Sequence, residues 1–249
     1  KIRGIYLRCD VALREKEGLE EYVGWYDKIP VTSQETTTEI VENGLKYLVD
    51  FKEGQKTGFF LDQKYNRLTI RNLAKDMTVL DCCTHTGSFA MNAALGGAKK
   101  VMALDISQKA LLDAKKNFWL NNLNIDTYCA DLFDYLRKLV DSKNKEYNLI
   151  ILDPPAFTKS KDTIKSALKG YQEINYLAMK ALPRGGYLAT ASCSHYASEE
   201  DFIRAIFNAS IMAGVSLRVV KKSYAAPDHP EVIGIPETKY LKFFIFQVV

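Results

Sequence analysis

The chain has 249 residues, 47% of them hydrophobic, and a formal net charge of +4. This length allows one large domain with a small appendage, and the apolar content is enough for a sizeable core. No apolar run approaches the ~18 residues of a membrane span, and no signal peptide is recognisable, so we expect no membrane association. The chain starts at Lys1 and not at Met, so we expect an upstream segment to be missing.

The five cysteines are odd in number and show no paired metal-ligand spacing. We therefore expect free thiols, a cytoplasmic location and no metal site. Cys82, Cys83 and Cys129 fall within predicted strands, which indicates inert core cysteines.

Residues 2–9 alternate apolar and polar side chains, as a strand does, and residues 46–51 predict a second strand. Few helical patterns lie between them. We expect a small β-rich element over residues 1–50 and a separate domain over residues 51–249.

From residue 78 onward, predicted strands and helices alternate, which is typical of an α/β fold with a doubly wound, Rossmann-like sheet. The last two strands are joined by a helix-free loop, which suits an antiparallel edge pair on a seven-stranded, mostly parallel sheet. The predicted strands are 78–83, 100–106, 126–131, 147–152, 187–194, 216–223 and 240–249, and the predicted helices are 88–95, 107–122, 132–140, 164–182 and one from 198.

Polar residues stand at the ends of five successive predicted strands. Parallel strands bring their carboxyl ends to one edge, where ligands bind in such sheets. Five such positions are hard to explain by stability alone. They are Asp81, Asp105, Asp131, Asp153 and Cys193.

The turn after the first of these strands contains only Gly87, so the three-glycine fingerprint of a dinucleotide site is missing. Asp81 suits an ammonium group, Asp105 suits ribose hydroxyls and Asp131 suits an adenine amino group. A helix cap or turn is the alternative for any one of them. Together they favour S-adenosylmethionine as the cofactor. The predicted cofactor-binding residues are Phe60, Asp62, Gln63, Arg67, Asp81, Thr84, His85, Thr86, Gly87, Ser88, Phe89, Asp105, Ile106, Ser107, Asp131, Leu132 and Asp153.

Two further motifs point to chemistry. Pro154 and Pro155 stiffen the exit of the fourth strand, so that Asp153 can face a planar base; a rigid strand exit is the alternative. Cys193 ends the fifth strand, where a thiol can act as a nucleophile with His195 near it; an inert cysteine is the alternative. We predict Cys193, Asp153 and Pro154 as the catalytic set.

Two segments outside these strand ends are also candidates for ligand contacts. Residues 56–67 mix aromatic, amide and charged side chains around a glycine, which suits a loop over a flat, charged ligand. Lys159, Lys161, Lys165 and Lys169 predict either phosphate contacts or a solvated helix face.

These motifs together resemble the ribosomal RNA large-subunit methyltransferase I family. The resemblance covers residues 54–249 and includes the segments 58–63, 81–89 and 153–157, and the tail residues Tyr240, Leu241 and Lys242. Such proteins begin with an RNA-binding PUA domain, for which this chain has no room. We expect residues 1–50 to be the end of that domain or the hairpin that follows it.

The resemblance implies a class I methyltransferase that forms 5-methylcytosine in 23S rRNA or a ribosomal subunit precursor, with Cys193 as the nucleophile. It also implies a homodimer. Two alternatives stay open: an N-methyltransferase acting on guanine or adenine of rRNA, and a non-catalytic S-adenosylmethionine-binding RNA or assembly factor. Ala156 stands between the prolines and Phe157, which weakens the first, and the intact Asp153, Pro154 and Cys193 weaken the second.

Overall fold

The computed structural model describes residues 2–11, 13–55, 57–158 and 160–249. The chain divides into two compact units. The N-terminal unit comprises residues 1–42 and 46–60, and the sheet unit comprises residues 43–45 and 61–249. The domain division predicted at residue 50 stays a prediction.

The N-terminal unit is rich in short strands, as predicted, and these strands pair two by two. Strand β1 pairs with β2, and β3 pairs with β4. The rings of Tyr6, Trp25 and Phe51 lie 5.2–5.9 Å apart and form an aromatic cluster beside β1. The elements are β1 (Tyr6–Cys9), α1 (Leu13–Lys16), β2 (Tyr22–Trp25), β3 (Thr37–Glu42) and β4 (Leu45–Asp50).

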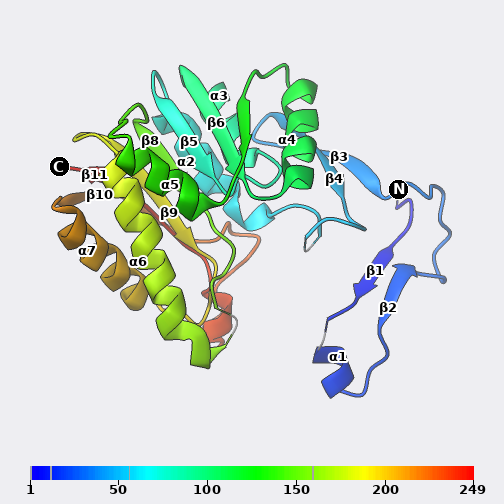
Figure 1. Cartoon of the computed structure of the whole chain (residues 1–249). Coiled ribbons are helices and arrows are strands. Elements are labelled where there is room, and N and C mark those ends of the chain that lie inside the picture. The colour runs from blue at the N-terminus through cyan, green and yellow to red at the C-terminus, as the bar shows by residue number, and fades with distance from the viewer. Residues whose placement is uncertain (1, 12, 56, 159) are drawn as a thin grey trace. The chain divides into compact units, whose positions relative to one another are not determined.

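The sheet unit is built on a seven-stranded sheet in the order β10-β11-β9-β8-β5-β6-β7 (Figure 1). Strands β5 to β9 are parallel, and β11 runs antiparallel to both β9 and β10. This confirms the predicted mostly parallel sheet with an antiparallel edge pair. The strands are β5 (Thr78–Cys82), β6 (Lys100–Asp105), β7 (Asp126–Cys129), β8 (Leu149–Leu152), β9 (Tyr187–Ser192), β10 (Leu217–Ser223) and β11 (Lys242–Val248).

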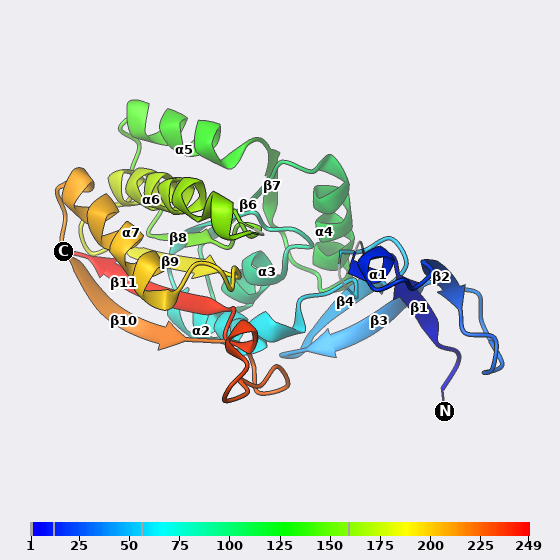
Figure 2. The ribbon, with the colours of Figure 1, turned by 90° about the horizontal axis from the view of Figure 1, so that it is seen from below.

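Helices cover both faces of this sheet, so its central strands are buried and read as continuous apolar runs. Helices α5, α6 and α7 lie on one face, and α2, α3 and α4 on the other (Figure 2). None of the helices in the described residues is long and apolar enough to cross a membrane. The helices are α2 (Lys64–Leu73), α3 (Ser88–Leu95), α4 (Gln108–Leu120), α5 (Leu132–Asp141), α6 (Ile164–Ala181) and α7 (Glu199–Ala213).

The segment predicted as a loop over residues 56–67 is partly helical. A 3₁₀ turn, η1 (Leu61–Gln63), leads directly into α2. Helix α2 buries Asn66 and Arg67 together with Ile70, so polar side chains occupy two inward positions. The apolar periodicity that identifies a helix is therefore weak here. Lys56 lies outside the described residues.

The cysteines are free thiols, but they are not all buried. Cys82 in the central strand β5 is fully buried, and Cys83 is partly buried. Cys129 is exposed, and its thiol donates to the Ile106 carbonyl at 3.4 Å. The prediction of a core cysteine is wrong for Cys129, because β7 is the edge strand of the sheet.

Candidate active site

The carboxyl ends of the parallel strands bring the predicted polar residues to one edge of the sheet. Asp105 is the last residue of β6, and Asp81 lies one residue before the end of β5. Asp153 and Cys193 directly follow β8 and β9. Asp131 follows β7 and caps α5. The topology therefore assembles five residues that are far apart in the sequence.

The turn between β5 and α3 is strained. Cys83 and His85 have φ values of 60° and 51°, and Gly87 has 82°. Left-handed backbone is costly for residues with a side chain, and such residues cluster at functional sites. The turn thus adopts the conformations of a glycine-rich loop with only one glycine. A Cβ atom at position 87 would lie 2.3 Å from the Phe118 ring, so only glycine fits there.

Asp81 holds this strained turn in place. One oxygen of its buried carboxyl group accepts hydrogen bonds from the Thr84 hydroxyl at 2.5 Å and from the Ala90 N–H at 2.9 Å. Burial raises the pKa of Asp81 to about 7, although these two hydrogen bonds oppose the shift. Asp81 has no exposed surface, so in this geometry it supports the turn. Its contact with an ammonium group stays a prediction.

Two further carboxylates bind backbone groups around the turn. Asp105 accepts from the His85 N–H at 2.8 Å and from the Ser107 N–H at 2.9 Å, which joins the turn to the start of α4. Asp131 accepts from the Phe133 N–H at 2.8 Å as the N-cap of α5. On the other side, the Asn117 side chain donates to the Thr86 carbonyl at 3.0 Å.

The acids lie close enough to shift the pKa values of neighbouring groups. Burial raises the pKa of the Cys83 thiol, and Asp105, Asp153, Asp81 and Asp131 add to this shift. Burial also lowers the pKa of His85, while Asp105 opposes this. The site edge around the turn is therefore strongly acidic, which suits the hydroxyl and amino groups of a ligand.

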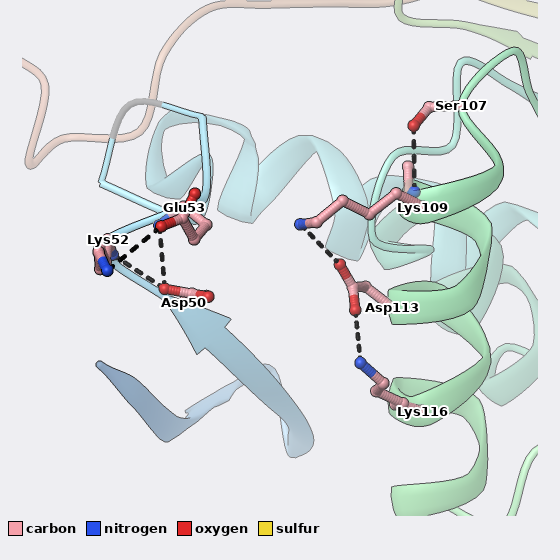
Figure 3. A network of polar contacts seen from close by, with 8 residues as sticks. Asp50, Lys52, Glu53, Ser107, Lys109, Asp113 and Lys116 are labelled. Atoms are coloured by element: carbon pink, nitrogen blue, oxygen red, sulfur yellow. Dashed lines mark hydrogen bonds and ion pairs between the residues drawn. The ribbon is translucent and has the colours of Figure 1, made fainter. Parts of the chain in front are cut away.

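The residues after the acids start helices or lie at the surface. Ser107 caps α4 by accepting from the Ala110 N–H at 3.2 Å, whereas Ile106 is exposed and Leu132 is buried. Figure 3 shows Ser107 above Lys109, Asp113 and Lys116, with Asp113 paired to both lysines.

Within the N-terminal unit, the same figure shows Asp50, which accepts from the Lys52 and Glu53 backbone N–H groups at 2.9 and 3.0 Å.

Helix α3 offers backbone donors at its start. Its N-cap is Gly87, which forms no side-chain capping bond. The first N–H groups of a helix lack acceptors within the helix and attract anionic groups; here one of them, the Ala90 N–H, already donates to the Asp81 carboxyl group. Arg67 from α2 is 1% exposed, and its guanidinium donates to the Ser88 hydroxyl at 3.5 Å. Phe89 is buried and stacks on Phe243.

A chain of side-chain hydrogen bonds orients Asp153. The Gln63 amide donates to Asp153 at 3.0 Å and accepts from the Asn66 amide at 2.6 Å. Asn66 in turn accepts from the Ser223 hydroxyl at 2.7 Å and donates to the Tyr224 carbonyl at 3.3 Å. The end of β8 is thus connected to α2 and to the end of β10.

The residues after Asp153 anchor the strand exit in the core. Pro154 is buried, and the Phe157 ring packs on the Tyr171 ring with centroids 4.6 Å apart. Gly170 makes this possible, because a Cβ atom there would lie 3.1 Å from the Phe157 ring. Phe157 therefore points into α6 and serves as a packing residue.

Cys193 is half-buried at the end of β9. The Ser192 hydroxyl before it donates to the Tyr171 hydroxyl at 3.0 Å. His195 is exposed, and its ring lies against Tyr196 with centroids 3.8 Å apart. The loop that carries the thiol is closed by Lys242, whose ammonium group donates to the Ser194 carbonyl at 2.5 Å.

Sequence reasoning gave no individual role to three polar residues that hold the site: Asn66, Tyr240 and Lys242. The Tyr240 hydroxyl donates at 2.7 Å to Asp62, which is buried and which we predicted as a cofactor ligand. Lys242 belongs to the tail that carries the resemblance, and it is a charged residue at the head of an apolar strand, but its buried partners are two backbone carbonyls that the sequence does not reveal.

Several predicted positions lie outside this arrangement. Phe60 belongs to the N-terminal unit, so its role stays a prediction. Lys165 and Lys169 are exposed on α6, and Lys159 lies outside the described residues. No cluster of potential metal ligands occurs among the residues that the structure describes.

Comparison with known proteins points to one family. The family described as S-adenosylmethionine-dependent methyltransferase matches residues 20–246. A protein of Pseudoalteromonas atlantica named ribosomal RNA large subunit methyltransferase I is 40% identical, over 99% of this chain and 62% of its own length. Proteins of the same name from Citrobacter koseri and Klebsiella pneumoniae are 39% and 40% identical over 98% of this chain. The chain therefore spans about three fifths of these relatives.

Solved structures share the fold. The crystal structure of SMU.776 complexed with SAH has a TM-score of 0.79 and 23% identity, covering 91% of this chain and 59% of that chain. A SAM-dependent methyltransferase from Agrobacterium tumefaciens has a TM-score of 0.68 and 20% identity, covering 90% of this chain and 74% of that chain. Both are consistent with the Rossmann-like sheet described above.

Proposed function

The chain belongs to the S-adenosylmethionine-dependent methyltransferase family, and we propose that it methylates C5 of a cytosine in large-subunit ribosomal RNA. The substrate class is suggested by the names of relatives about 40% identical to it. The cytosine-C5 chemistry depends on one observation: Cys193 lies at the same sheet edge as Asp153, directly after the neighbouring strand.

The donor and acceptor groups at this edge fit S-adenosylmethionine. The first turn of α3, with Arg67 beside it, offers positive charge and N–H donors for a carboxylate. Asp105 and Asp131 offer acceptors for ribose hydroxyls and an adenine amino group. When bound there, the cofactor supplies an electrophilic methyl group on a sulfonium.

The chain's own residues explain how a cytosine would become reactive. C5 is a weak nucleophile until a group adds at C6. The Cys193 thiolate forms a bond to C6, and the electron pair of the C5–C6 double bond moves toward C5. Asp153, held by Gln63, binds N3 and favours its protonated form. After methylation a base takes the C5 proton, the electron pair restores the double bond and the Cys193–C6 bond breaks.

The packing of Phe157 favours this reaction over methylation of an exocyclic amine of a base. Enzymes of that second kind stack the target base on an aromatic residue immediately after the two prolines. Here Ala156 takes that position, and Phe157 is packed against Tyr171. A non-catalytic RNA-binding or assembly role is less consistent with the strained turn and the oriented Asp153.

The test compares two cysteine variants of the full chain, Cys193→Ala and Cys129→Ala. We expect the first to lose transfer of tritiated methyl to unmodified 23S rRNA and the second, with its exposed edge-strand thiol, to retain it. Binding of S-adenosylmethionine, measured by calorimetry, should be unchanged in both. Full transfer by Cys193→Ala would overturn the cytosine-C5 mechanism.

A second measurement identifies the product. Nucleoside mass spectrometry of the methylated RNA should give 5-methylcytidine, whereas a methylated guanosine or adenosine would support the alternative. An RNA with 5-fluorocytidine at the target should form a covalent adduct with Cys193, because the fluorine cannot leave as a proton does. We further propose a cytoplasmic location and a homodimer, the second of which analytical ultracentrifugation tests.

A further inference from the structure

Lys242 is a buried lysine whose side chain binds the loop that follows Cys193. It opens β11, is 1% exposed, and its Cα is paired with that of Ser192, the residue before Cys193. Its ammonium group donates to the Ser194 carbonyl at 2.5 Å and to the Ala197 carbonyl at 2.6 Å. These carbonyls follow Cys193 in the chain, so one side chain closes the loop that presents the thiol.

Within the described part of the chain, no ion pair joins Lys242 to an acid. The carboxylate of Glu199, whose charge acts on Lys242, is bound by the Lys222 ammonium and the Tyr224 hydroxyl. A buried charge is costly unless it is paired, so a lysine here needs a compensating negative group.

The Cys193 thiolate is one of the two negative groups whose charge acts on the Lys242 ammonium. Burial lowers the pKa of Lys242 to about 8, and the negative charges of Cys193 and then of Glu199 oppose this shift. The interaction is reciprocal, because a cation that is stabilised by a thiolate also stabilises that thiolate.

We propose that Lys242 is a positioning residue for the Cys193 nucleophile, whose loop it closes and whose thiolate its ammonium group stabilises. This inference rests on the proposed function, in which Cys193 attacks cytosine C6. The thiol must first lose its proton to solvent or base, which leaves the electron pair on sulfur. A nearby positive charge favours that step, as at other reactive cysteines.

The other titratable groups that act here do not supply this charge. Tyr171 from α6 and Tyr240 before β11 are both affected by Cys193. Burial raises the pKa of Tyr171 to about 12 and also raises that of Tyr240, so both are neutral at pH 7. Asp153 and Glu199 are acids and oppose a thiolate. Lys242 is thus the cation in this group.

The test measures the reactivity of Cys193 without any substrate. The full chain is alkylated with iodoacetamide between pH 6 and pH 10, and mass spectrometry quantifies the Cys193 peptide. We expect Lys242→Met to move the midpoint of this profile upward by about one pH unit, which makes alkylation at pH 7 roughly tenfold slower. Lys242→Arg should recover part of the shift. Lys221→Met, which removes an exposed lysine from neighbouring β10, should leave the profile unchanged.

If Lys242 had a purely structural role, Lys242→Met would change thermal stability but not the alkylation midpoint of Cys193. A midpoint in Lys242→Met equal to that of the wild type would therefore overturn the proposal. If Lys242→Met does not fold, the wild-type chain gives the answer. Its Cys193 midpoint should be lower in the folded protein than in urea, and an equal or higher value would overturn the proposal.

Methyl transfer to 23S rRNA separates this inference from the proposed function. If the midpoint shifts in Lys242→Met but the wild type transfers no methyl to cytosine, the proposed function is overturned and the proposed role of Lys242 is supported. If the wild type forms 5-methylcytidine but the Lys242→Met midpoint does not move, the function stands and the inference fails.

Discussion

The two ends of the site are each held by one buried charge of opposite sign. Asp81 accepts from Thr84 and Ala90 at the turn before α3. Lys242 donates to the carbonyls of Ser194 and Ala197 in the loop after β9. Burial moves both toward neutrality, raising the pKa of Asp81 to about 7 and lowering that of Lys242 to about 8.

The two buried charges differ in sign because each segment leaves a different kind of backbone group without a backbone partner. The start of a helix leaves N–H groups, which need an acceptor, so an acid closes the turn before α3. The loop between β9 and α7 turns two carbonyls inward, which need a donor, so a lysine closes it. The sign of each buried charge is thus set by the local backbone.

The largest expected effect comes from neutralising the acid. Since the pKa of Asp81 is raised from 3.8 to about 7, its contribution to stability is present below pH 3.8 and lost as the pH rises through 7. Asp81→Asn should therefore gain stability relative to the wild type between pH 4 and pH 7, by up to about 4 kcal/mol. Urea unfolding across this range measures the difference, and a constant difference would contradict the assignment.

The lysine should behave in the opposite way. Because the pKa of Lys242 is lowered from 10.5 to about 8, its contribution is present above pH 10.5 and lost as the pH falls through 8. The wild type should gain stability relative to Lys242→Met between pH 8 and pH 10, by up to ~3 kcal/mol. Guanidinium unfolding at these pH values tests this, with Lys221→Met as the variant that should show no such trend.

A smaller effect is expected from the hydrogen bond between Tyr240, just before β11, and Asp62. Tyr240→Phe removes the 2.7 Å hydrogen bond to buried Asp62 and leaves the ring in place. The loss should be about 2 kcal/mol of unfolding free energy, because the acceptor stays buried. Tyr65→Phe, at an exposed position of α2, is the control. Equal unfolding curves for the two variants would show that the bond contributes nothing.

The smallest expected effects lie on α4 at the turn end. Ser107→Ala removes the N-cap and should cost about 1 kcal/mol. Lys116→Ala removes an exposed pair with Asp113 and should cost ~0.3 kcal/mol. Thermal unfolding of both variants compares them, and a larger loss for Lys116→Ala would reverse the expected order.

Much of the fold was predictable because β5, β6 and β8 are largely apolar runs and because strands and helices alternate along the chain. The resemblance drawn from the motifs is confirmed by relatives about 40% identical. Helix α2 was missed because it turns Asn66 and Arg67 inward. Cys129 was misjudged because a strand in the sequence does not reveal whether it lies at the edge of the sheet.

The sequence by itself determined which residues stand at the strand ends, since Asp105, Asp153 and Cys193 follow apolar runs that any reading detects. Only the tertiary structure decided what surrounds them. The left-handed backbone at Cys83 and His85 appears only in the folded turn. The hydrogen bond from Gln63 to Asp153 and that from Lys242 to the Ser194 carbonyl each join segments that are distant in the chain. Burial and hydrogen bonding of this kind depend on the packed fold, because they arise only when those segments exclude water together.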